Sequence, residues 1–319
     1  MAVYTPVSAE ALEALLVHYD LEDVRSLKGI AEGIENTNYL LETARGRFIL
    51  TLYEKRVKAG DLPYFMALLH HLSLKGVPVA TPRARRDGGT VSTLCGKPAA
   101  ILTFLDGVSV TRPSLAQAHE AGRALAAMHW AAADFPLRRA NDLWLPGLAR
   151  IAAATAGRAH EVAPGLGRLI ADELEAQAAH DTRGLPHGPI HADLFPDNVL
   201  FLGDRLTGLI DFYFACDGLF AYDLAIMLNA WAFHDGALDT AIANAIISGY
   251  ERIRTLTPGG RAAIPMLARA AALRFLLTRL HDWLNPAPDA LVKPKDPRDY
   301  ITILAWHRAA PPPAAYGFP

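Results

Sequence analysis

The first hundred residues combine helical spacing of apolar side chains with several short apolar runs. Behind Ser8, a favoured helix N-cap residue, apolar residues recur at helical spacing from 11 to 19. The runs 39–41 and 48–53 flank a glycine-containing turn and are typical of a β-hairpin. This pattern predicts a small antiparallel sheet with packed helices, composed of helices at 11–19 and 62–72 and strands at 39–41, 48–53, 90–92 and 99–104.

From residue 113 onward the pattern becomes mostly helical. Ser114 and Gln117 form a capping-box pattern in front of an amphipathic run. A strand-rich insertion at 189–214 interrupts the helices, and we expect the proline- and alanine-rich end, 309–319, to lie extended or disordered. The predicted helices are 115–129, 143–155, 166–179, 222–233, 238–253 and 265–283.

This division predicts an α+β protein of two lobes, residues 1–105 with the small sheet and 106–319 with most of the helices. The composition, 51% hydrophobic and 20% charged, is that of a globular protein. A formal net charge of −2 does not favour nucleic acid or anionic lipid as a partner, so we expect a small-molecule ligand. The N-terminus lacks the pattern of a secretion signal, and we expect a soluble, cytoplasmic protein whose two cysteines, Cys95 and Cys216, are core residues.

The residues with the strongest chemical pattern lie between 191 and 211. Asp193 precedes Asn198 by five residues, and an apolar strand, a Gly-Asp turn and a second strand then lead to Asp211. A hairpin of these strands would bring Asn198 and Asp211 to the same end. Phosphoryl transfer needs a carboxylate that orients the acceptor hydroxyl and oxygen ligands that hold Mg²⁺ on the nucleotide. We therefore predict Asp193 as the base and Asn198 and Asp211 as metal ligands.

The same residues resemble a known family. The His-x-Asp-x-x-x-x-Asn sequence, followed by an apolar strand and Ile-Asp-Phe, is similar to the catalytic and magnesium-binding loops of the aminoglycoside and choline phosphotransferases, which have a protein-kinase-like fold. The resemblance implies a bilobal protein-kinase-like fold that uses ATP and Mg²⁺. It also implies that His191 and Asp223 orient the catalytic loop, that Asp193 is the base and that Asn198 and Asp211 hold the metal.

The nucleotide end departs from this family. A kinase-like fold usually carries a phosphate-binding lysine on the strand after the glycine-containing loop, and Thr51 occupies that position here. Lys55 or Arg56 is a candidate replacement, and Leu105 opens the segment that we predict as the hinge. The candidate ATP-binding residues are Gly33, Asn36, Thr37, Asn38, Thr51, Lys55, Phe104 and Leu105.

Longer matches, including 35–39, 50–56 and 211–216, resemble the members of this family that phosphorylate the hydroxyl of L-homoserine to O-phospho-L-homoserine in threonine biosynthesis. That resemblance implies homoserine as the acceptor, and monomer and homodimer both stay open. An amino-acid acceptor needs a cation for its carboxylate, and an arginine fork suits this group. The candidate acceptor residues are Tyr213, Asp217, Arg274, Arg279 and Trp283.

Three alternatives remain at this stage. A kinase of the same fold could act on choline or an aminoglycoside, although a near-neutral chain fits a strongly cationic aminoglycoside poorly. The missing lysine is compatible with a non-catalytic nucleotide-binding module. The histidine and aspartate content is compatible with a two-metal hydrolase, which usually needs more imidazole ligands than this segment offers.

Overall fold

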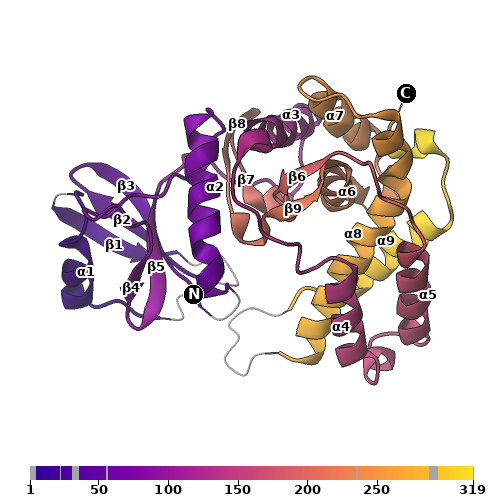
Figure 1. Ribbon diagram of the computed structural model, residues 1–319, viewed down its shortest axis with the longest axis horizontal. Coiled ribbons are helices and arrows are strands. Elements are labelled where there is room, and N and C mark those ends of the chain that lie inside the picture. The colour runs from indigo at the N-terminus through magenta and orange to yellow at the C-terminus, as the bar shows by residue number, and fades with distance from the viewer. Residues whose placement is uncertain are drawn as a thin grey trace. The chain divides into compact units, whose positions relative to one another are not determined.

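The structure, a computed structural model, describes residues 5–21, 23–30, 36–54, 57–234, 236–286 and 294–318 (Figure 1). By its internal contacts the chain divides into two units. The first unit comprises residues 1–107 together with 207–213, and the second comprises 108–206 and 214–319. Each unit is described separately below.

The first unit is built on a five-stranded antiparallel sheet in the order β1-β2-β3-β5-β4. Alternate residues on the central strands, such as Leu41, Leu50 and Ile101, are fully buried and form one apolar face of the sheet. The register places Thr51 opposite Asn38. The strands are β1 (Val24–Gly29), β2 (Thr37–Thr43), β3 (Gly46–Leu52), β4 (Ser92–Leu94) and β5 (Lys97–Thr103).

Among the described residues of this unit, two α-helices accompany the sheet, and Figure 1 shows the sheet between them. Helix α1 (Ala9–Leu16) begins at Ser8, whose hydroxyl accepts a hydrogen bond from the Ala11 amide at 3.2 Å. Its Leu12 joins the apolar core of the sheet. Helix α2 (Leu62–Leu74) follows a 3₁₀ turn and has a proline in its first turn, where the missing N–H has no helical partner to lose.

The second unit is mostly helical. Helix α8 packs against α4, α5, α6 and α9, so its residues are mainly buried along its length. The helices are α3 (Leu115–Ala131), α4 (Leu145–Thr155), α5 (Leu166–Ala178), α6 (Phe220–Trp231), α7 (Thr240–Glu251), α8 (Pro258–Leu284) and α9 (Arg298–Arg308).

Helices α3 and α7 approach each other closely at two glycines. A Cβ atom on Gly122 would lie 2.1 Å from the backbone oxygen of Ile246, and one on Gly249 would lie 2.0 Å from that of His119. No side chain fits such a distance. The two glycines therefore set how closely these helices pack.

Short strands in the second half of the chain precede and follow the residues predicted to be catalytic. β6 (His187–Ile190) pairs antiparallel with β9 (Cys216–Leu219). β7 (Val199–Leu202) and β8 (Arg205–Leu209) form the hairpin expected from the sequence, and β10 (Phe233–His234) pairs with β11 (Ala237–Leu238). The α+β class and the predicted small antiparallel sheet are thus confirmed.

Three expectations for the second unit need correction. Helix α8 begins at Pro258, two turns before the predicted 265, because the Thr257 side chain caps it and Pro265 is accommodated inside it. Helix α9 was not predicted. The described part of the proline- and alanine-rich end is packed, since the Tyr316 hydroxyl lies 2.9 Å from His307 Nδ1 and the Gly317 carbonyl accepts from Asn244 Nδ2 at 2.8 Å.

Of the two cysteines, Cys216 is buried as predicted, whereas Cys95 is exposed in a tight turn with φ of 51°. In the part of the chain that the structure describes, no helix has both the length and the apolar character needed to cross a membrane.

Candidate functional site

The segment that carries Asp193 follows strand β6 and precedes a 3₁₀ turn at Pro196–Asn198. Ala192 has φ of 65°, in the left-handed region that non-glycine residues seldom adopt. The amides of His191 and Ala192 each donate to the carboxylate of Asp223, at 2.8 Å. Because both oxygens of Asp223 are used, helix α6 fixes the backbone immediately before Asp193.

Asp223 is itself held by a buried histidine. His129 Nε2 lies 3.0 Å from Asp223 Oδ2, and His129 Nδ1 lies 2.9 Å from the Tyr250 hydroxyl. Burial alone would raise the pKa of Asp223, but the hydrogen bonds and charge interactions with His129 and His191 together outweigh it and hold that pKa below its ordinary value. Burial lowers the pKa of His129. Asp223 is therefore a carboxylate that accepts hydrogen bonds.

Asp193 and Asn198 lie together, as predicted. The Asn198 side-chain NH₂ donates to the Asp193 carbonyl at 2.8 Å and lies 3.4 Å from its carboxylate oxygen Oδ2. Because the NH₂ faces Asp193, the Asn198 side-chain oxygen Oδ1 is the atom that can face a cation. An amide oxygen of this kind is a suitable ligand for Mg²⁺.

Asp211 follows β8 and belongs to the first unit. The strand end is anchored by the Leu209 amide, which donates to the Pro78 carbonyl at 2.8 Å. Asp211 has φ of 64°, a conformation that costs energy for a side-chain-bearing residue and is concentrated at functional sites. Its negative charge adds to the burial that raises the pKa of Tyr53 and Tyr213, whose hydroxyls are 3.0 Å apart.

At the position of the missing lysine, the Thr51 hydroxyl donates to Asn38 Oδ1 at 2.8 Å. The residues next to Thr51, Leu50 and Leu52, face the apolar core, so Thr51 and Asn38 lie on the other face of the sheet. This neutral pair lies where the sequence predicts the phosphate-binding lysine of a kinase-like fold.

A lysine does lie nearby, but on the opposite face. Lys97 pairs with Glu54, which also accepts from the Thr37 hydroxyl at 2.7 Å. Lys97 lies on β5, on the same face as Ala99 and Ile101, which belong to the apolar core. Lys97 therefore does not replace the missing lysine beside Thr51.

The other candidate nucleotide residues have mixed placements. Asn36 Oδ1 accepts from the Glu54 amide at 3.4 Å. The Phe104 amide donates to the Arg47 carbonyl at 3.2 Å, and Leu105 is half-buried just before the division between the units. Gly33, Lys55 and Arg56 lie outside the described residues.

Comparison with known proteins decides the family. A family model described as the phosphotransferase enzyme family matches residues 26–256, well over half of the chain. The chain belongs to this family. Among solved structures, the amicoumacin kinase hAmiN, in complex with AMP-PNP, Ca²⁺ and Ami, is similar with a TM-score of 0.69 at 16% identity, over 94% of this chain and 91% of that one.

A choline kinase from Cryptosporidium parvum is similar to the phosphotransferase with a TM-score of 0.69 at 13% identity, over 95% of both chains. These kinase neighbours confirm the predicted bilobal kinase-like fold class. In sequence, the chain is 52% identical to a homoserine kinase of Xanthobacter autotrophicus, over 99% of both proteins. It is also 52% identical to a homoserine kinase of Rhodospirillum rubrum, again over 99% of both.

In the phosphotransferase, the three predicted acceptor residues on α8, Arg274, Arg279 and Trp283, have different surroundings. Arg274 is 2% exposed and donates to the Ala192 carbonyl. Arg279 lies 3.1 Å from Asp299, its guanidinium stacks over the Tyr300 ring at 4.6 Å, and Trp283 lies under Arg298. Of the arginines predicted to bind the acceptor, Arg274 is the one in contact with the catalytic loop.

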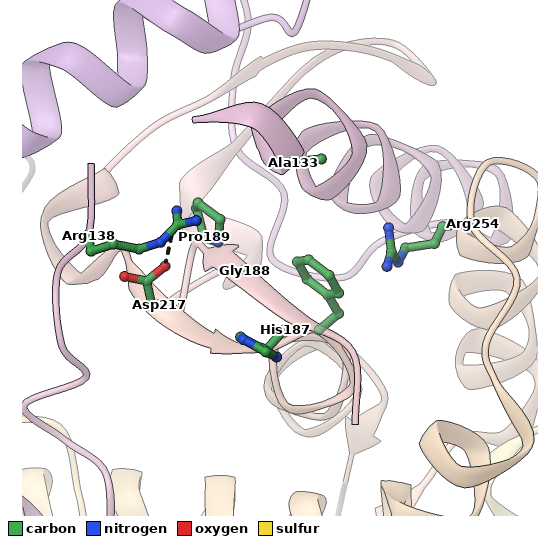
Figure 2. Close-up of a pocket in the computed structure, with 8 residues that line it drawn as sticks. Ala133, Arg138, His187, Gly188, Pro189, Asp217 and Arg254 are labelled. Carbon is green, nitrogen blue, oxygen red and sulfur yellow. Dashed lines mark ion pairs between the residues drawn. The ribbon is translucent and has the colours of Figure 1, made fainter. Parts of the chain in front are cut away.

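Asp217 lines a pocket beside β6 and β9, where Arg138 Nη1 lies 3.8 Å from its carboxylate (Figure 2). The Arg139 amide also donates to Asp217, at 2.9 Å. The pocket holds about 190 Å³, less than the ~300–1,000 Å³ of typical small-molecule sites. The carboxylate of Asp217 is thus held by the Arg139 backbone amide and the Arg138 side chain.

Sequence reasoning missed His129 and Tyr250. His129 lies on the buried face of the predicted helix 115–129, and a polar residue on such a face is a signal that a buried partner exists. The partner could not be identified, because Asp223 is 94 residues away. Among the described residues, no group of three or more histidine, cysteine, aspartate or glutamate side chains is arranged to hold a metal ion, so the cluster expected of a two-metal hydrolase is not found there.

Proposed function

We propose that this chain is an ATP-dependent homoserine kinase, which transfers the γ-phosphoryl group of ATP to the hydroxyl of L-homoserine and produces O-phospho-L-homoserine and ADP. The observation that carries the proposal is about 50% identity to curated homoserine kinases along the full chain. Membership of the phosphotransferase enzyme family supports the reaction class. The solved amicoumacin kinase complex with AMP-PNP supports the use of ATP.

Asp193 acts as the base in this proposal. Its carboxylate orients the homoserine hydroxyl and accepts the hydroxyl proton as the oxygen bonds to the γ-phosphorus. The bond from that phosphorus to the bridging oxygen breaks, and ADP leaves with the electron pair. The backbone of this loop does not depend on the substrate for its shape, since Asp223 already holds it.

Asn198 and Asp211 are the proposed Mg²⁺ ligands. Amide and carboxylate oxygens are the hard donors that this ion prefers, and the orientation of the Asn198 NH₂ toward Asp193 leaves its oxygen for the metal. Mg²⁺ bound with the nucleotide would neutralise charge on the phosphate oxygens. The Asn198 side chain has a second role, because its NH₂ donates a hydrogen bond to the Asp193 carbonyl and so holds the backbone there.

The nucleotide contacts proposed from the sequence are Gly33, Asn36, Thr37, Asn38, Thr51, Lys55, Phe104 and Leu105. Thr51 and Asn38 supply neutral hydrogen-bonding groups where related kinases carry a lysine. Tyr213, Asp217, Arg274, Arg279 and Trp283 stay predictions as acceptor contacts. A cytoplasmic location and a monomer or homodimer also stay predictions.

The direct test is an ADP-release assay on the purified chain with ATP and Mg²⁺, in which L-homoserine, serine, choline and an aminoglycoside are compared. We expect strong stimulation by homoserine, and O-phosphohomoserine identified by mass spectrometry. Stimulation by choline or an aminoglycoside alone would reassign the acceptor while keeping the reaction class.

A second measurement separates an enzyme from a binding module. Asp193→Asn should lower kcat by about 10²–10⁴-fold, the usual contribution of a general base, while ATP binding measured by calorimetry stays unchanged. Asp197→Asn is the matched control, since Asp197 lies on the same loop with an exposed side chain paired to Lys295. Equal turnover by both variants would remove Asp193 from the mechanism.

A further inference from the structure

Arg274 is a buried cation that the proposed chemistry does not yet use. It lies in the middle of α8, and its side chain is 2% exposed. A buried arginine keeps its charge, so the protein must supply partners for the guanidinium. Those partners identify what the residue does.

The guanidinium contacts the catalytic loop at two points. Nη1 donates to the Ala192 carbonyl, and Nη2 lies 3.9 Å from Asp193 Oδ1. Ala192 is the residue with left-handed backbone, so its carbonyl does not continue the direction of strand β6. Arg274 thus satisfies a carbonyl that this strained conformation turns toward α8.

Two aromatic rings lie against the guanidinium itself. It stacks over Phe275 at 4.4 Å and lies 5.3 Å from the centre of the Phe214 ring. Burial raises the pKa of the nearby Tyr222 hydroxyl to about 12, and the charge of Arg274 opposes this rise. Because these contacts occupy the planar group, Arg274 has little freedom to turn toward a ligand.

The loop is therefore held from two helices. Asp223 on α6 accepts the amides of His191 and Ala192, and Arg274 on α8 donates to the carbonyl of Ala192. The peptide unit that joins Ala192 to Asp193 is held at its carbonyl by Arg274 and at its amide by His191 Nδ1, 3.2 Å away, while Asp223 holds the peptide before it. Its orientation sets the direction in which the Asp193 side chain leaves the backbone.

We propose that Arg274 is a positioning residue for phosphoryl transfer, which holds the Ala192–Asp193 peptide and the Asp193 carboxylate in the reactive orientation. This inference rests on the proposed role of Asp193. It replaces the interpretation of Arg274 as the ligand of the acceptor carboxylate. A lysine cannot reproduce the planar contacts to a carbonyl, a carboxylate and two rings.

The test compares Arg274→Lys with the wild-type protein. We expect kcat for homoserine to fall by about 100-fold, the effect of a misplacement of roughly 1 Å at a reacting group. The KM values for homoserine and ATP should change by less than about threefold, since no ligand contact is lost. A large rise in the homoserine KM with kcat retained would show that Arg274 binds the carboxylate of the acceptor, and would overturn the proposal.

A double-mutant cycle distinguishes positioning from a general structural role. If Arg274 acts through Asp193, Arg274→Lys introduced into Asp193→Asn should lower kcat by less than about threefold, because residues that act as a unit are not additive. A further 100-fold fall in that background would contradict the proposal. If the wild-type protein does not phosphorylate homoserine, the proposed function is wrong. That result is distinguishable from a failure of the positioning role, which requires an active wild-type enzyme.

Two further variants guard against misfolding. Arg261→Lys lies on the same helix, with its guanidinium paired to Glu251 at 2.7 Å, and should keep wild-type kinetics. Phe275→Leu removes the ring against the guanidinium without placing a lysine in the core, and should lower kcat at unchanged KM. Wild-type kcat in Phe275→Leu, in protein that binds ATP normally, would count against the positioning role even if Arg274→Lys failed to fold.

Discussion

His129 and Asp223 form a fully buried pair, with His129 Nε2 3.0 Å from Asp223 Oδ2. Since the pKa of Asp223 is held low and that of His129 is lowered by burial, the pair is a carboxylate and a neutral imidazole. The imidazole then carries its proton on Nε2 and accepts from the Tyr250 hydroxyl at Nδ1. The carboxylate that holds the catalytic loop is thus oriented from a third helix.

Replacement of this histidine should weaken both the fold and the loop. His129→Leu keeps a similar volume but removes one of the three groups that donate to Asp223. We expect the free energy of unfolding to fall by about 1–3 kcal/mol, the usual cost when a buried polar group loses a hydrogen-bond partner. Urea denaturation measures this loss, and kcat for homoserine should fall in the folded fraction.

The matched control for this change is His119→Leu on the same helix. The His119 side chain is partly exposed beside Glu120, and surface changes usually stay within about 0.5 kcal/mol. If both variants had the same stability, the buried pair would not contribute as described.

The proposed metal ligands predict a change in magnesium requirement. Asp211→Asn removes the negative charge of one proposed ligand, and Asn198→Ala removes the amide oxygen of the other. We expect the Mg²⁺ concentration for half-maximal velocity, at saturating homoserine, to rise by at least about tenfold, the lower end of effects seen around metal ligands. Chelation of Mg²⁺ with EDTA should abolish turnover in the wild-type protein.

Asp204→Asn is the control for the metal experiment, because Asp204 lies in the turn between β7 and β8 and accepts from Ser114 at 3.0 Å. Its Mg²⁺ dependence should match the wild type. An unchanged requirement in Asp211→Asn would remove that residue from the metal site.

Local sequence signals predicted much of this structure. The capping box of Ser114 and Gln117 forms as expected, with the Ser114 hydroxyl accepting from the Gln117 amide at 3.1 Å. The five-residue spacing of Asp193 and Asn198 likewise places their side chains in contact. Both features depend on neighbours in sequence, and a periodic pattern or a short motif contains that information.

The contacts that hold the catalytic loop depend on residues far apart in the chain. Arg274 is 82 residues from Ala192, and nothing in its helical pattern shows that its side chain turns toward a backbone carbonyl. The start of α8 was misplaced for a local reason, since Pro265 suggested a first turn but lies inside the helix. Packing, which the sequence pattern does not display, decides the contact of Arg274, whereas the local Thr257 cap decides where α8 begins.

Another buried histidine predicts how stability varies with pH. Burial, with a smaller effect of the Arg269 charge, lowers the pKa of His307 to about 3. Below pH about 6.5 the unfolded chain binds a proton at this imidazole that the folded protein does not bind. The free energy of unfolding should therefore decrease as pH falls from about 6.5 toward 3, by up to about 1.4 kcal/mol per pH unit from this group.

Urea denaturation of His307→Gln at several pH values tests this linkage. The variant loses the contacts of His307 to Tyr316 and Asn229 and should be less stable at pH 7, but its stability should depend less on pH. His70→Gln, exposed on α2, should keep the wild-type slope. A wild-type slope in His307→Gln would show that this histidine does not titrate on unfolding.

The last prediction concerns the contact between α3 and α7, the two helices that carry His129 and Tyr250. A methyl group on Gly122 would lie 2.1 Å from the Ile246 carbonyl oxygen, so Gly122→Ala must push the helices apart. We expect the free energy of unfolding to fall by about 1–3 kcal/mol, the usual cost of overpacking.

The control is the same substitution at Gly167 on α5, where the added methyl group would meet its nearest atom at 3.8 Å. There alanine should be neutral or stabilise the protein by up to about 1 kcal/mol, because it favours the helix over glycine. Opposite signs in thermal or urea unfolding would establish that close approach of the backbones, and not helix propensity, selects glycine at 122, whereas a stabilised Gly122→Ala would refute the close packing.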